Sequence, residues 1–226
     1  MEMEIVLPDN VAVMTLPNVA FFPQALLPLH IFEPRYRQML KDVLASHRLF
    51  AVAGINPAAA GGFEPPHRVA TVGIIRACQK QDDGTSSLLL QGLARVEFLA
   101  VLREEPYRCV RIRPLASQPG AAGAENSRRR HDLLRLITLR QRLGGGVGGR
   151  EEFLGFLRTI DDPEAFVDLA AFSLCEDAPL KQTLLETLDV HARLGLFSRH
   201  LRGEIGALRL RHRLQGRLAD DDIENN

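Results

Sequence analysis

The hydrophobic pattern of this chain changes type partway along its length, and that change limits the folds open to it. Residues 1–116 carry short runs rich in Val and Ile between Pro and Gly, whereas residues 127–219 carry apolar side chains at helical spacing. The first pattern is typical of β-strands and the second of amphipathic helices. We therefore expect an α+β chain with a β subdomain over 1–116, a linker over 117–126, a helical bundle over 127–219 and an acidic tail over 220–226.

The first part of the chain contains six candidate strands and one candidate helix. Short consecutive strands with tight turns favour an antiparallel sheet that curls into a barrel, and Asp82-Asp83-Gly84 supplies a hairpin turn. An amphipathic helix over about 34–46 is expected to pack on the barrel, since Pro34 suits a first helical turn. The predicted strands are Val11–Leu16, Arg48–Ile55, Arg68–Gln79, Ser86–Leu90, Arg95–Arg103 and Tyr107–Leu115.

The second part is expected to be helical throughout. Asp162, Asp177 and Asp189 each precede a stretch with apolar periodicity, as N-cap residues do. The glycine run over 144–149 ends the first helix and predicts a flexible turn. The expected helices cover 127–143, 151–160, 163–174, a stretch from about Pro179, and 190–218.

Composition and charge exclude several classes of protein. Lys plus Arg and Asp plus Glu both number 28, so the net charge is zero, which disfavours a generally basic nucleic-acid binder. No apolar run approaches the roughly 18 residues of a membrane helix, and the acidic N-terminus does not resemble a signal peptide. Cys78, Cys109 and Cys175 are too widely spaced for a zinc site and predict free thiols. We expect a cytoplasmic protein with no metal and no cofactor.

Motifs that would carry catalysis are missing from the sequence. The glycine run lacks the preceding strand and the following Lys-Ser/Thr of a phosphate loop. Neither a metalloprotease HExxH nor a GxSxG nucleophile elbow occurs, and Cys175 has no His near it in sequence. A buried structural thiol is the favoured interpretation of Cys175. We expect a protein that is not an enzyme.

Residues 16–36, called here the Pro-rich segment, are strongly apolar but interrupted by four prolines. Because these prolines deny a continuous sheet ladder, we expect an extended segment laid over the sheet or a partly exposed apolar surface. The alternative is that its apolar side chains are core, and that Glu33 and Arg35 pin the start of the helix. The candidate peptide- or partner-binding residues are Phe21, Phe22, Leu26, Leu27, Leu29 and Ile31.

The Pro-rich segment resembles the opening of the Lon-type N-terminal domain, the substrate-binding domain of the Lon ATP-dependent protease. The shared pattern is L-P-N-x-x-x-F-P followed by L-P-L-x-I-F-E-P-R-Y, with further matches at 71–73, 91–96 (a G-x-x-R turn) and 181–194. The resemblance spans about 11–202 and implies a six-stranded PUA-like barrel followed by a helical bundle. The residues of the pattern that we expect to be structural are Pro17, Pro23, Pro28, Phe32, Glu33, Pro34, Arg35, Tyr36, Gly73, Gly92 and Arg95.

The resemblance implies a non-catalytic module that binds polypeptides in protein quality control. Its partners would be unfolded or degron-bearing polypeptides, or one specific protein. Full Lon continues into an ATPase module and a protease with a Ser-Lys dyad, and neither is recognisable in this sequence. We therefore expect a stand-alone bacterial Lon-domain protein without those activities.

The last predicted helix supports an alternative. Residues 190–218 hold seven Arg and one Glu, a local charge of 7 − 1 = +6, and PUA-type barrels of other families bind RNA. The alternative function is therefore nucleic-acid binding, with a patch formed by Arg209, Arg211 and Arg213. Zero net charge and few aromatic residues disfavour it, and a solvated basic helix is the simpler interpretation. No membrane partner is expected.

Overall fold

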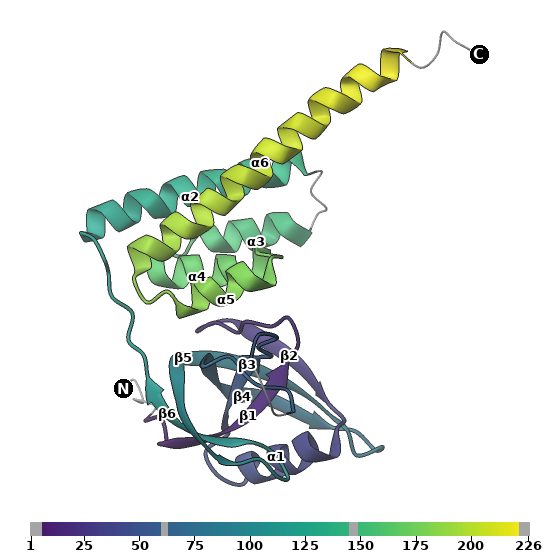
Figure 1. The fold of residues 1–226 in the computed structure, drawn as a ribbon, viewed down its shortest axis with the longest axis vertical. Helices are drawn as coiled ribbons and strands as arrows, with labels where there is room; N and C mark the ends of the chain where they lie inside the picture. Colours follow the sequence, from purple (N-terminus) through teal and green to yellow (C-terminus); the bar gives the residue numbers. More distant parts are fainter. Residues whose placement is uncertain (1–5, 60–62, 145–148, 222–226) are drawn as a thin grey trace. The chain divides into compact units, whose positions relative to one another are not determined.

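The computed structural model describes residues 6–59, 63–144 and 149–221 (Figure 1). The expected flexibility of the glycine run therefore falls largely outside the described residues, as does most of the acidic tail.

The mixture of strands followed by helices confirms the α+β class. The elements are β1 (Asn10–Leu16), β2 (Leu26–Ile31), α1 (Pro34–Leu44), β3 (Leu49–Gly54), β4 (Val69–Lys80), β5 (Ser86–Arg103), β6 (Cys109–Pro114), α2 (Gly123–Leu143), α3 (Gly149–Arg158), α4 (Pro163–Leu174), α5 (Ala178–Glu186) and α6 (Val190–Asp221).

The chain divides into two compact units. The first contains residues 1–117 and 168–188, and the second contains 118–167 and 189–226. The segment 168–188 was expected in the helical bundle but groups with the sheet. The reason lies in long-range polar contacts within the first unit, where Gln182 Nε2 donates to the carbonyl of Val69 at 3.1 Å. The helix α2 begins at Gly123, inside the stretch expected to be a linker.

The strands form one mixed sheet in the order β2-β5-β4-β3-β1-β6. An additional antiparallel pairing between β5 and β6 means that strand pairings run from β5 through β4, β3, β1 and β6 back to β5. The pairing of β1 with β3 is parallel, so the expectation of a wholly antiparallel sheet is wrong. Parallel neighbours need a crossover connection, and here the crossover carries β2 and α1.

Two expectations about the strands are wrong. The stretch 86–103 is one continuous strand, β5, rather than two strands separated by a turn at Gly92. Irregularity appears instead as register shifts in the β4–β5 ladder, between Val72 and Gly73 and between Ile75 and Ala77. The prolines do not deny a ladder to the Pro-rich segment either, since β2 pairs with β5 over all six of its residues, Pro28 included.

Strands β1 and β3 at the centre of the first unit are buried on both faces. Buried residues alternate along β6, as its sequence pattern predicted, whereas β1 is buried without interruption from Val11 to Thr15. The amphipathic helix α1 buries Tyr36, Met39, Leu40 and Val43, again as expected from their spacing. The main cluster consists of Val11, Val13, Leu49, Ala51, Ala53, Ala70, Val72, Val96, Phe98, Val110 and Ile112.

The second unit is built around α2 and α6. Leu133 and Ile137 of α2 are buried, and so are the periodic apolar residues of the first half of α6. The side chain of Arg130 is also buried and donates to the carbonyls of Leu157, Arg158 and Ile160 at the end of α3. Across the described part of the chain, no helix combines the length and apolar character needed to cross a membrane.

Candidate functional site

The first half of the Pro-rich segment lies directly on β5. Gln24 donates its backbone N–H to the carbonyl of Gly92 at 2.8 Å, and Gly92 donates to the carbonyl of Ala25 at 2.9 Å. A Cβ atom on Gly92 would lie 2.1 Å from the carbonyl oxygen of Phe22. Only glycine permits this approach without displacement of the backbone, which gives Gly92 a physical role in a strand rather than in a turn.

Three of the candidate binding residues are inaccessible. Phe21, Phe22 and Ile31 are buried, so for these side chains the core interpretation is correct. The ring of Phe21 meets the edge of Phe172 at 6.1 Å, and the guanidinium group of Arg95 lies over the ring of Phe22 at 5.7 Å. These side chains hold the Pro-rich segment in place and cannot contact a partner.

The outward face of β2 carries a row of exposed side chains that we call the β2 strip: Leu26, Pro28, His30 and Phe32. Leu26 is 51% exposed and Phe32 is 61% exposed, while Leu27 and Leu29 on the other face are half-buried. The rings of His30 and Phe32 stack with their centroids 6.0 Å apart. Phe32 had been expected to be structural; the alternation of side chains along an extended strand would have placed it in the same row as Leu26.

The β2 strip borders an open sheet edge. Among the described residues, β2 pairs only with β5, and residues 26–31 make no backbone hydrogen bond outside that ladder. An edge strand tolerates Pro28 because one side of it has no ladder to interrupt. Such an edge offers backbone N–H and C=O groups to another extended chain.

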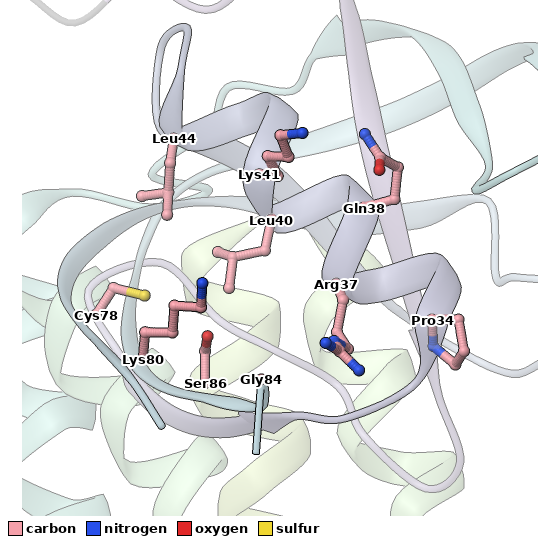
Figure 2. A pocket seen from close by; sticks show the side chains of 10 residues that line it. All are labelled: Pro34, Arg37, Gln38, Leu40, Lys41, Leu44, Cys78, Lys80, Gly84 and Ser86. Carbon is pink, nitrogen blue, oxygen red and sulfur yellow. The ribbon is translucent and has the colours of Figure 1, made fainter. Parts of the chain in front are cut away.

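A groove lies between α1 and the β4–β5 hairpin, at the end of β2 (Figure 2). Its volume is about 490 Å³. Ser86 of the hairpin lines it and is the register partner of Ile31. The remaining lining residues are Pro34, Arg37, Gln38, Leu40, Lys41, Leu44, Cys78, Lys80 and Gly84.

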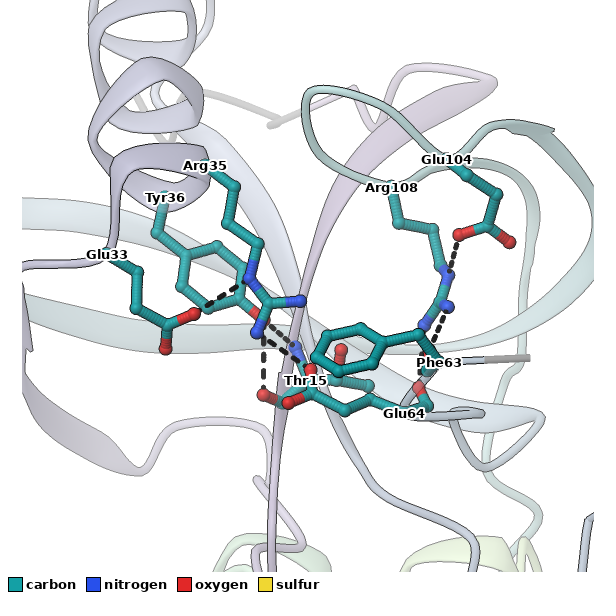
Figure 3. A network of polar contacts seen from close by, with 8 residues as sticks. All are labelled: Thr15, Glu33, Arg35, Tyr36, Phe63, Glu64, Glu104 and Arg108. Atoms are coloured by element: carbon teal, nitrogen blue, oxygen red, sulfur yellow. Dashed lines mark hydrogen bonds and ion pairs between the residues drawn. The ribbon is translucent and has the colours of Figure 1, made fainter.

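Polar contacts fix the start of α1 (Figure 3). Arg35 donates to Glu33 and to Glu64, each at 2.8 Å, and its guanidinium group lies over the rings of Tyr36 and Phe63. Burial disfavours the charged guanidinium, but the hydrogen bonds to the two carboxylates outweigh it and raise the pKa of Arg35. These contacts give Glu33 and Arg35 a structural role at the helix start.

Tyr36 and Arg108 extend the same network. The hydroxyl group of Tyr36 accepts from the backbone N–H of Thr15 at 3.1 Å and donates to its carbonyl. Arg108 donates to the carboxylate of Glu104 and to the carbonyls of Phe63 and Glu64. The network therefore joins β1, the start of α1 and the stretch before β6 (Figure 3).

The other residues of the family pattern differ in exposure. Tyr36, Gly73, Gly92 and Arg95 are buried, whereas Pro17, Pro28, Phe32 and Pro34 are exposed. Pro23, Glu33 and Arg35 lie in between. A Cβ atom on Gly73 would lie 2.7 Å from Cγ of Leu90, so this glycine also permits a close approach.

The arginines proposed as a nucleic-acid patch do not share one face of α6. Arg209 and Arg213 are one helical turn apart, whereas Arg211 is two residues from each and points away. All three are exposed. The three residues therefore do not form one patch on a single side of α6.

The described ranges contain no group of three or more His, Cys, Asp or Glu placed to hold a metal ion. Cys78, Cys109 and Cys175, all of them in the described ranges, form no disulfide bond, and Cys175 is buried.

Comparison with known proteins gives one consistent family. The model of the ATP-dependent protease La (LON) substrate-binding domain matches residues 10–203. The chain is 26% identical to Lon proteases of Desulfosudis oleivorans and Syntrophus aciditrophicus, over 95% of its own length. It spans only 26% and 28% of those two relatives.

Solved structures agree in fold. The N-terminal domain of Mycobacterium avium complex Lon protease aligns over 87% of this chain and 98% of its own, with a TM-score of 0.64 and 18% identity. The Lon N-terminal domain protein from Xanthomonas campestris aligns over 82% of this chain and 95% of its own, with a TM-score of 0.56 and 19% identity.

Proposed function

The chain belongs to the family of Lon substrate-binding domains, and from this premise we propose that it binds polypeptide segments through the β2 strip and the adjoining edge of the sheet. The observation that carries the proposal is the exposure of Leu26 and Phe32 in one row beside an unpaired strand edge. Exposed apolar side chains in a contiguous row are typical of interaction surfaces.

The binding mode follows from the two kinds of group that β2 presents. The open edge offers main-chain hydrogen bonds to an extended chain, and the apolar side chains of the strip contact alternate side chains of that chain. Main-chain pairing is insensitive to sequence, which suits a domain that accepts unfolded polypeptides. The lack of an amide hydrogen at Pro28 limits how long a continuous ladder can be on this edge.

A binding role fits the family match, which is to a substrate-binding domain. We propose that the chain presents polypeptides or one specific partner within protein quality control. We also interpret the circuit of strand pairings through β5, β4, β3, β1 and β6 as a PUA-like barrel.

Fluorescence anisotropy with a labelled, permanently unfolded polypeptide of low net charge tests the proposal. Leu26→Asp and Phe32→Asp should each weaken binding by about tenfold, since each places a charge in the apolar contact. Leu99→Asp is the matched control, because Leu99 is also exposed (46%) on β5 but lies outside the strip. Binding should persist at high salt.

Two results would refute the assignment. Equal affinities for the two strip variants and the unmodified protein would show that the β2 strip is not the binding surface. An equal loss in Leu99→Asp would show that any exposed apolar residue contributes non-specifically. Circular dichroism of each variant establishes that it is folded.

A further inference from the structure

The groove beneath α1 has an excess of positive charge that the fold does not use. Arg37, Lys41 and Lys80 line it, and no lining residue is acidic. Within the described parts of the chain, none of these three side chains makes an ion pair or a side-chain hydrogen bond. Unpaired cations around a concave surface attract anionic ligands.

Two acidic residues close to the groove, Asp42 and Asp83, are held by other partners. The carboxylate of Asp83 accepts from the backbone N–H of Thr85 at 2.9 Å and from its hydroxyl group at 2.7 Å. Those two hydrogen bonds also lower the pKa of Asp83, with a smaller contribution from Arg37. Asp42 accepts from Gln38 and from the hydroxyl group of Tyr107. Neither carboxylate neutralises the groove by a direct contact.

The shape of the groove favours a ligand with an aliphatic part. Leu40 and Leu44 are directed from α1 towards the hairpin, and Lys80 rises from the hairpin towards the helix (Figure 2). Leu40 is 5% exposed and forms an apolar floor, while Leu44 is 38% exposed. The guanidinium group of Arg37 lies over Gly84, where a Cβ atom would be 2.3 Å from Nη2.

A nucleic acid is a poorer match for this groove. No aromatic side chain lines it, so bases would have no stacking platform. A polypeptide with carboxylates beside an aliphatic residue would complement both the cations and the floor.

We propose that this groove binds an acidic polypeptide segment that carries an aliphatic side chain among its carboxylates. This inference rests on the proposed function, because the ligand is a polypeptide. It adds the chemical class of polypeptide that the domain binds. Because Ser86 of the groove pairs in register with Ile31, the groove lies next to the end of β2. The domain therefore prefers apolar segments that are flanked by acidic residues.

The test uses fluorescence anisotropy with two labelled peptides at low ionic strength. One contains Asp-Asp-Asp-Ile-Glu, and the other replaces each acid by its amide, Asn-Asn-Asn-Ile-Gln. The acidic peptide should bind at least about tenfold more tightly, and its affinity should fall as salt is added. Arg37→Glu and Lys80→Glu should each weaken its binding by about tenfold.

The matched control is Arg111→Glu, which makes the same change in net charge on an exposed side chain of β6 outside the groove. It should leave the affinity within about twofold of the unmodified protein. Equal binding of the acidic and amide peptides, or an equal loss in the control, would refute the proposal. So would tighter binding of a labelled RNA that Lys80→Glu abolishes.

Failure of the groove proposal can be distinguished from failure of the proposed function. Lys80→Glu should still bind the unfolded polypeptide of low net charge, because the β2 strip is unchanged. If that polypeptide binds and the acidic peptide does not, the groove proposal fails and the proposed function stands.

Discussion

The guanidinium group of Arg95 on β5 meets the carboxylate of Asp168 on α4 at 2.6 Å, with the two side chains only 2% and 1% exposed. The Nε atom of Arg95 also donates to the carbonyl of Leu185 at 3.0 Å. This pair ties the segment 168–188 to the sheet within the first unit. In this pair each buried charge faces the opposite charge of its partner.

Removal of one partner should therefore be strongly destabilising. Asp168→Asn or Arg95→Met removes one member of this buried ion pair, and each should lower the free energy of unfolding by about 3–5 kcal/mol in urea titrations. The double variant should lose less than the sum of the two single variants, because it leaves no isolated charge. Losses below about 1 kcal/mol for both single variants would contradict this account.

Local signals made much of this fold predictable. The expected N-cap residues Asp162, Asp177 and Asp189 accept from the backbone N–H groups of Ala165, Leu180 and Ala192 at 2.8, 2.9 and 2.8 Å. Capping depends on side chains three residues away, and so it is visible in the sequence. The amphipathic stripe of α1 is local in the same sense.

Long-range relationships could not be predicted in this way. The burial of Arg95, Arg130 and Arg193 depends on acceptors far away in the chain, and an arginine in an apolar stretch gives no sign of them. The candidate site was predicted in part: the Pro-rich segment was identified, but its buried and exposed residues follow from the pairing of β2 with β5. The basic groove lies between α1 and the β4–β5 hairpin, and the sequence does not reveal the register of that hairpin.

Gly92→Ala tests the close approach of the Pro-rich segment to β5. The new Cβ atom would lie 2.1 Å from the carbonyl oxygen of Phe22, so the segment must shift. We expect a loss of more than about 2 kcal/mol in the free energy of unfolding and faster amide exchange at Gln24 and Gly92. Gly203→Ala on α6, where a Cβ atom meets nothing within 4 Å, should instead stabilise by about 0.5–1 kcal/mol. Undiminished protection at Gln24 in Gly92→Ala would count against the assigned role.

Tyr107 provides a test based on pH. Burial and a hydrogen bond to Asp42 raise the pKa of its phenol, with Arg103 opposing the shift. A raised pKa means that the folded state holds the proton more tightly, so this contribution to stability is present below the ordinary tyrosine pKa of about 10 and is lost as the pH rises. Because the chain has two Tyr and no Trp, tyrosinate absorbance reports the titration directly.

The two variants that bear on Tyr107 have different expected effects. Tyr107→Phe should remove the contribution of this one phenol from the absorbance titration. Asp42→Asn should lower the pKa of Tyr107, although burial still raises it. An unchanged titration in Asp42→Asn would show that the hydrogen bond at 2.8 Å does not contribute.

Arg130 should stabilise the end of α3 through its backbone acceptors. Its guanidinium group donates to Ile160 at 2.7 Å and Arg158 at 3.1 Å, and it lies 5.0 Å from the ring centroid of Phe166. Helix ends leave carbonyls without partners, and buried ones are costly when unpaired. Arg130→Met should therefore lower the free energy of unfolding by about 3 kcal/mol and increase amide exchange at Thr159 and Ile160.

A second arginine on the same helix separates this effect from a general loss of charge. The side chain of Arg135 is 85% exposed and forms a surface ion pair with Asp132 at 3.8 Å, so Arg135→Met should change stability by less than about 0.5 kcal/mol. Arg130→Lys should fall between the two, because one ammonium group keeps the charge but cannot reach the same set of carbonyls in a fork. Similar losses in Arg130→Met and Arg135→Met would mean that the buried guanidinium does not hold α3. A large loss confined to Arg130→Met would show that this arginine belongs to the core of the second unit.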